Sequence, residues 1–151
     1  MKKNLYRRNK YNILTIIVYL FACFFLSYFN VFDASPKNEQ YHLNLLTVNS
    51  VFLGFLFTGL GMMVGFADKK SVKSLNTAGY MDNYYNSIYL GLFFLIISTI
   101  VTIIGIVIGK EYVVPLLIYI QQITFVGGIL FFIKSIFGLM KLIKYIRNDD
   151  L

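Results

Sequence analysis

The chain has 151 residues and a formal net charge of +7, and only 14% of its residues are charged while 58% are hydrophobic. About a quarter of the residues in a soluble domain are charged, so this composition excludes an ordinary water-soluble fold. The single cysteine, Cys23, excludes an internal disulfide.

Four long stretches contain no Asp, Glu, Lys, Arg or His. They cover residues 11–32, 43–67, 83–109 and 112–133. About 20 helical residues cross the hydrocarbon core of a bilayer, and each stretch reaches that length. The sequence therefore predicts an all-α membrane protein, an antiparallel four-helix transmembrane bundle forming one domain over residues 1–151. The predicted spans are about 12–32, 44–67, 86–109 and 113–134.

The basic residues are distributed unevenly around these spans. Of the fourteen Lys and Arg residues, all but Lys37 and Lys110 lie before the first span, after the second or after the fourth. Short loops rich in Lys and Arg stay in the cytoplasm. We therefore expect a multi-pass protein of the bacterial inner membrane with both termini cytoplasmic.

The largest connection between spans runs from Asp68 to about Ser87. We expect Asp68 to cap a short helix in which Val72 and Leu75 share one face, and Gly79 to end that helix.

The fourth span should continue beyond the membrane. Pro115 suits the first turn of this helix, where a missing N–H has no cost. We predict an amphipathic basic extension over residues 135–147. Its apolar face is expected to hold Ile136, Leu139, Ile143 and Ile146, with Lys134 and Lys141 opposite.

Small residues recur at helical spacing along the second and third spans. In the second span they are Thr47, Gly54, Thr58, Gly61 and Gly65, and in the third they are Ser87, Gly91, Ser98, Thr102, Gly105 and Gly109. Each stripe ends in a GxxxG pattern, which lets helix backbones approach closely in lipid. The pattern predicts that these two helices pack tightly, with each other or across the subunits of a homo-oligomer.

Amide and hydroxyl side chains mark a polar layer within the spans. It contains Asn49, Thr102, Gln121, Gln122 and Thr124. Amides in lipid need hydrogen-bond partners. Bonds between helices inside the bundle are one interpretation, and a pore or ligand pocket in an oligomer is the other.

Several kinds of site are missing from the sequence. No ionisable residue lies inside a predicted span, whereas proton-coupled transporters need one there. The only histidine, His42, is expected in the outer loop, and one histidine supports neither a His-based metal site nor a His-centred triad. No glycine-rich loop follows a strand. We therefore expect a non-enzymatic protein without a catalytic residue, cofactor or metal.

The basic residues beside the spans are candidate contacts on the cytoplasmic side. They are Lys69, Lys70, Lys73, Lys141, Lys144 and Arg147. Anionic lipid headgroups are one expected partner. An acidic cytosolic protein is another, and no direct binding of nucleic acid is expected, because basic clusters beside spans are ordinary.

The segment GFLFTGLGMMVGFADKKSVKSL from Gly54, followed by TAGYMDNYY, resembles small four-helix bacterial membrane proteins of phage-defence loci, such as the Kiwa membrane subunit. The resemblance covers the second span and the following loop. It implies a membrane component that works with a cytosolic partner in response to phage or membrane stress.

These observations lead to three hypotheses of function. The first is a self-associating membrane sensor or anchor that holds a cytosolic partner. The second is a homo-oligomeric pore, holin-like or an abortive-infection effector, lined by Gln121, Thr124 and Gly128. The third is an immunity protein that shields a membrane target from a bacteriocin.

Overall fold

A computed structural model describes residues 5–33, 35, 37–108 and 114–149 of the chain. These residues form five helices and no strand. The helices are α1 (Leu5–Tyr28), α2 (Glu39–Gly65), α3 (Lys70–Ala78), α4 (Tyr80–Ile108) and α5 (Pro115–Asp149).

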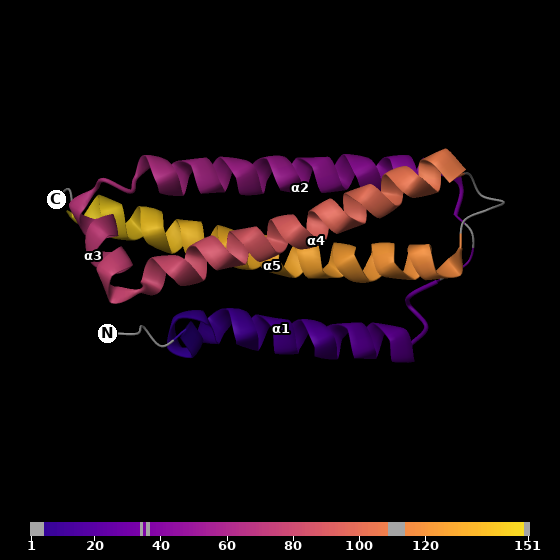
Figure 1. Cartoon of the computed structure of the whole chain (residues 1–151), viewed down its shortest axis with the longest axis horizontal. Coiled ribbons are helices and arrows are strands. Elements are labelled where there is room, and N and C mark those ends of the chain that lie inside the picture. The colour runs from indigo at the N-terminus through magenta and orange to yellow at the C-terminus, as the bar shows by residue number, and fades with distance from the viewer. Residues whose placement is uncertain (1–4, 34, 36, 109–113, 150–151) are drawn as a thin grey trace.

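Four of the helices are long and apolar enough to cross a membrane, namely α1, α2, α4 and α5. They lie side by side, with α1 and α4 running from one end of the molecule to the other and α2 and α5 running back (Figure 1). The short helix α3 lies at the end where α1 begins and α5 finishes. The chain is therefore a multi-pass membrane protein with one small helix outside its long helices.

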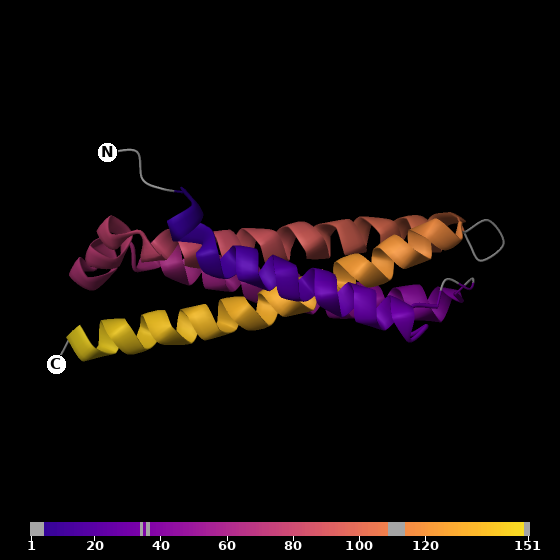
Figure 2. The ribbon, with the colours of Figure 1, turned by 90° about the horizontal axis from the view of Figure 1, so that it is seen from below.

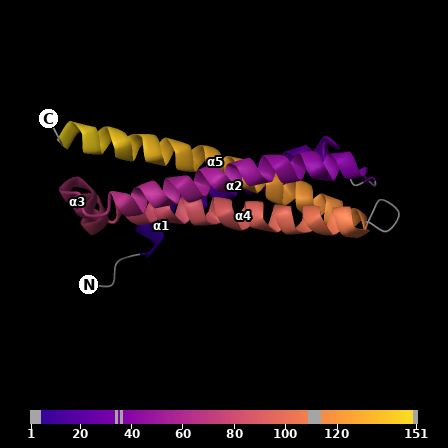
Figure 3. The ribbon, with the colours of Figure 1, turned by 90° about the horizontal axis from the view of Figure 1, so that it is seen from above.

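The helices α4 and α5 form the centre of the molecule. They cross in the view of Figure 1, and Figures 2 and 3 show them spreading apart toward the α3 end, while α2 packs on both of them. In the described part of the chain α1 packs on α4 and α5 but makes no packing contact with α2. Most described side chains of α1 are exposed, so it is the least buried of the four long helices.

The helix ends differ from the predicted spans because caps, rather than charges, end a helix. Asn30 has a left-handed backbone (φ 53°), and the N–H of Val31 donates to the carbonyl of Leu26 at 2.9 Å, so α1 ends at Tyr28. The Asn38 side chain accepts from the N–H of Tyr41 at 2.9 Å, which begins α2 at Glu39.

The small-residue stripe of α4 lies in the core, as the close packing of helices requires. Ser87, Gly91, Ser98, Thr102 and Gly105 are all buried, and Gly109 lies outside the described residues. A methyl group on Gly91 would lie 2.9 Å from Cδ1 of Leu56 on α2. Large side chains of one helix thus fill the space that small residues of the next leave open.

The second and third predicted spans pack on each other as α2 and α4, but the small-residue stripe of α2 is not the face that packs and points outward. A Cβ atom on Gly54, Gly61 or Gly65 would have no atom within 4 Å, and Thr47 and Thr58 are exposed. α2 instead buries Leu45, Asn49, Leu56, Gly59 and Met63, with His42 at its start. Because α4 already supplies small residues, α2 can pack with larger ones.

The connection between α2 and α4 is a small ordered unit. Val72 is 2% exposed, and it joins Met63, Met81, Leu142 and Ile146 in one apolar cluster. Leu75 packs against this cluster, which confirms that Val72 and Leu75 share an inward face.

Of the two predicted ends of α3, only the C-terminal one agrees with the structure. The N-cap of α3 is Lys69, whose side chain does not cap the helix, while Asp68 pairs with Lys73 at 3.4 Å, so the predicted Asp68 cap is wrong. Gly79 ends α3 as predicted, with φ 84°, and this left-handed turn leads directly into α4.

The extension of α5 is helical as predicted, and it reaches Asp149 without a break. Its buried face is rotated from the predicted one. Leu142 and Ile146 are buried, whereas Ile136 and Ile143 are exposed. Gly138 lies on the buried side, where Tyr84 of α4 packs directly on it, with its Cδ1 2.9 Å from where a Cβ would lie.

Candidate functional site

Five buried polar side chains form a hydrogen-bonded chain across α2, α4 and α5, toward the end opposite α3. Gln121 Nε2 on α5 donates to Thr102 Oγ1 on α4 at 2.7 Å and meets His42 Nδ1 on α2 at 3.3 Å. Thr102 Oγ1 donates to the carbonyl of Ser98 at 2.6 Å, and Asn49 Nδ2 donates to Ser98 Oγ at 3.0 Å. We call these five residues the polar chain.

The position of His42 corrects the sequence analysis. It lies in α2 rather than in a loop, and it is only 2% exposed. A Cβ on Gly105 would lie 2.6 Å from Cε1 of its ring, so the imidazole lies directly on the α4 backbone. His42, which directly precedes the uncharged stretch 43–67, is therefore an ionisable group within a helix long enough to cross a membrane.

The hydrogen bonds define the tautomer of His42. The structure places the amide nitrogen of Gln121 toward Nδ1; in this amide orientation Nδ1 accepts and the ring proton lies on Nε2. That Nε2–H has no partner among the described residues, and neither do Gln121 Oε1 and Asn49 Oδ1. Unpaired polar groups in an apolar interior cost free energy. The polar chain therefore contains donors and acceptors that could still form hydrogen bonds.

Two other residues of the predicted polar layer lie outside the polar chain. Gln122 Nε2 donates to the backbone carbonyl of Asp33 at 2.8 Å and so ties α5 to the loop after α1. In that loop, hydrogen bonds from Lys37 and Ser35 hold the pKa of the Asp33 carboxyl well below its usual range. Thr124 Oγ1 donates to the carbonyl of Ile120 on its own helix at 2.8 Å.

A second polar cluster joins α1 to the core and was not recognised in the sequence. Lys134 Nζ donates to Asn12 Oδ1 and, at 3.0 Å, to Thr15 Oγ1. Asn12 Nδ2 also donates to the carbonyl of Asn83 on α4 at 3.2 Å. Lys134 therefore faces α1 rather than lying on a solvated basic face, which corrects the prediction. The clue was the asparagine Asn12 at the start of the first predicted span, because an amide in lipid needs a hydrogen-bond partner.

The six predicted contact residues lie on the exposed surface at the α3 end. Lys69, Lys70 and Lys73 come from the start of α3, and Lys141, Lys144 and Arg147 come from the last turns of α5; all six are exposed. The apolar cluster of Val72, Leu142 and Ile146 holds the two elements together beneath them. We call this surface the basic platform.

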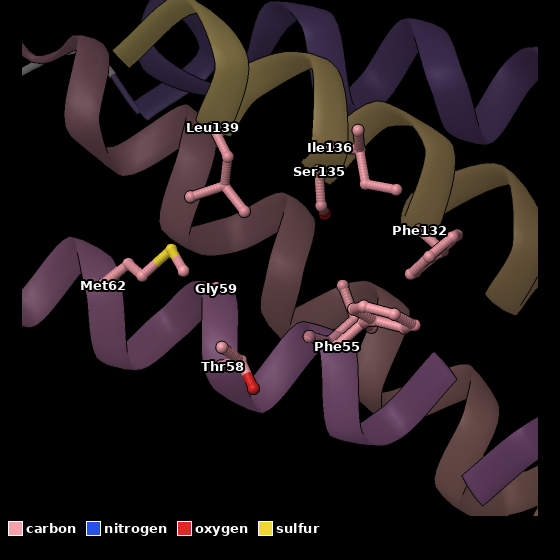
Figure 4. A pocket seen from close by; sticks show the side chains of 9 residues that line it. Phe55, Thr58, Gly59, Met62, Phe132, Ser135, Ile136 and Leu139 are labelled. Carbon is pink, nitrogen blue, oxygen red and sulfur yellow. The ribbon is translucent and has the colours of Figure 1, made fainter. Parts of the chain in front are cut away.

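A shallow apolar groove of about 130 Å³ lies between α2 and α5 (Figure 4). Phe55, Met62, Phe132 and Leu139 line it. Its two hydroxyl groups, on Thr58 and Ser135, donate to carbonyls of their own helices. The lining is therefore suited to hydrocarbon rather than to a polar ligand.

Comparison of the chain with protein-family models, curated proteins and solved structures finds no match. Within the described residues, no three His, Cys, Asp or Glu side chains lie close enough to hold a metal ion.

Proposed function

We propose that this protein is a non-enzymatic, self-associating sensor or anchor subunit of the bacterial inner membrane that holds a cytosolic protein. In this proposal the long helices form an antiparallel transmembrane bundle with both termini in the cytoplasm. The resemblance to phage-defence membrane proteins implies that this subunit acts in a response to phage.

The observation that carries the proposal is the basic platform. It combines six exposed cationic side chains with an ordered apolar base, in which Val72 is 2% exposed. A loop needed only to connect two spans would not require such packing. A preformed surface lowers the entropy cost of binding, and its charge favours an acidic partner or anionic headgroups.

The outward stripe of α2 supports self-association. Gly54, Gly61 and Gly65 present open backbone to the surroundings. In lipid, such a surface gains dispersion contacts only when another helix approaches it, because acyl chains fill it less well.

The pore hypothesis has less support from the packing. The stripe of Gln121, Thr124 and Gly128 faces the interior of the helix bundle. Gln121 is fully buried there, and Leu95 of α4 packs on Gly128. A pore lined by this stripe would require α4 and α5 to separate.

Co-purification tests the partner. Protein extracted from native membranes in a mild detergent should carry a cytosolic protein in constant ratio, and combined Lys69→Gln, Lys70→Gln and Lys73→Gln should remove it. Lys10→Gln is the control, because Lys10 is an exposed residue near the start of α1, outside the platform. Wild-type protein that purifies alone, or equal loss in the control, would contradict the proposal.

A further inference from the structure

The His42–Gln121 contact has two features that a purely structural hydrogen bond does not need. The ring of His42 is 2% exposed and Gln121 is fully buried, yet His42 Nε2 and Gln121 Oε1 have no partner among the described residues. In addition, the Gln121 amide nitrogen faces Nδ1, which is the acceptor in the Nε2–H tautomer and, in that tautomer, the ring nitrogen able to take up a proton.

We propose that His42 and Gln121 form a proton-binding site at the end of the bundle opposite α3. A proton is a ligand that requires no cavity, because it adds to the lone pair of Nδ1 in place. His42 lies in the first turn of α2, close to the end of the long helices. The proposal concerns the membrane domain alone and stands whether or not a cytosolic partner exists.

Binding of the proton would rearrange the polar chain. The Nδ1 lone pair becomes an N–H bond, so Nδ1 can no longer accept from Gln121 Nε2. A half-turn of the Gln121 amide places Oε1, unpartnered in the neutral form, opposite the new Nδ1–H. Thr102, which now accepts from Nε2 and donates to the Ser98 carbonyl, would then donate to Oε1 instead.

This rearrangement makes the hydrogen bonds between α2, α4 and α5 depend on the protonation of His42. In the neutral form Gln121 of α5 donates to α2 and α4, and in the protonated form it accepts from both. Each form satisfies the His42–Gln121–Thr102 contacts with a different hydrogen-bond direction. The site is therefore a two-state element of the kind that a sensor needs.

Few other titratable groups surround His42. On α2 they are Tyr41, whose ring meets the imidazole edge-on, and Glu39, which is exposed one turn earlier. Thr102 and Gly105 of α4 contact the site, and none of the residues 90–108 of α4 is titratable. On α5, Tyr119 is bonded to Ser27 of α1. Among the described residues no carboxylate is bonded to the ring, so the positive charge of the imidazolium would come from the added proton alone.

Nuclear magnetic resonance of the full chain in lipid nanodiscs tests the site directly. His42 is the only histidine, so ¹⁵N-histidine labelling reports this ring without assignment. At about pH 8 we expect the Nε2–H tautomer, and on acidification toward about pH 5 we expect the imidazolium form. A ring that shows the Nδ1–H tautomer, or that does not titrate while the protein stays folded, would overturn the proposal.

A second label tests the rearrangement. The chain has three glutamines, Gln40, Gln121 and Gln122, so ¹⁵N-glutamine labelling gives three side-chain amides. One amide, assigned by its loss in Gln121→Met, should shift with the same midpoint as the ring. Gln121→Glu, nearly equal in shape, should raise that midpoint by about one pH unit or more, because a carboxylate stabilises imidazolium. Absence of a coupled amide, or an unchanged midpoint in Gln121→Glu, would refute the proposed rearrangement.

Discussion

At the scale of single residues, glycines permit close helix contacts only where they lie on a face that packs against another helix. Gly105 lies beneath the His42 ring, and Gly91 lies beneath Leu56. Gly54 has no atom near its missing side chain. The sequence places all three on equivalent small-residue stripes, so only the packing distinguishes them.

Replacing Gly105 should therefore destabilise the fold. In Gly105→Ala the new methyl would lie 2.6 Å from His42 Cε1, and the ring cannot withdraw between α2 and α4 without breaking its bond to Gln121. We expect a loss of about 1–3 kcal/mol in unfolding free energy, measured by titration with a denaturing detergent. Gly54→Ala is the matched control and should change stability by much less. Equal effects of the two changes would contradict the packing described here.

At the scale of helices, α1 differs from the others in how it is held. It is apolar and mostly exposed, and polar bonds from Lys134 to Asn12 and Thr15 attach it to α5, beside the bonds of Tyr19 and Ser27 to the same helix. The charge-free stretch predicted the helix correctly, but the sequence did not reveal this attachment. Whether a lysine at the end of one span faces water or another helix depends on how the two helices are placed.

Lys134→Met should loosen α1 while leaving the other helices packed, since it removes charged hydrogen bonds but keeps side-chain length. Bonds to a charged group contribute about 1.5–3 kcal/mol each. Spin labels on Lys10 and Tyr80, in a Cys23→Ala background, should then give a broader distance distribution. Lys141→Met, which alters an exposed lysine of the same helix, is the control. A distribution as narrow as that of the unaltered chain would show that α1 does not depend on Lys134.

At the scale of the whole molecule, two surfaces remain open for assembly: the basic platform beside α3 and the outward stripe of α2. The stripe was predicted from the sequence, but its direction was not. The four-helix packing uses the opposite face of α2, so the stripe is available to a second copy.

A bulky residue in the stripe should abolish self-association without unfolding the chain. Gly61 has no atom within 4 Å of its missing Cβ, so Gly61→Leu should leave the monomer intact. We expect photobleaching-step counts in liposomes to fall to single copies. Val48→Leu, on another exposed part of α2, should not change them. An unchanged step count for Gly61→Leu would exclude the stripe as the interface.

The membrane-crossing helices, the small helix α3 and the helical end of α5 all follow from the sequence. Length, lack of charge and local turn residues are properties of a segment by itself, and a bilayer responds to them segment by segment. The inward faces of α2 and α5, the burial of His42 and the bond from Lys134 to α1 depend on the tertiary structure. They require several helices to fit together at once, because a side chain is buried only where a neighbouring helix leaves space for it.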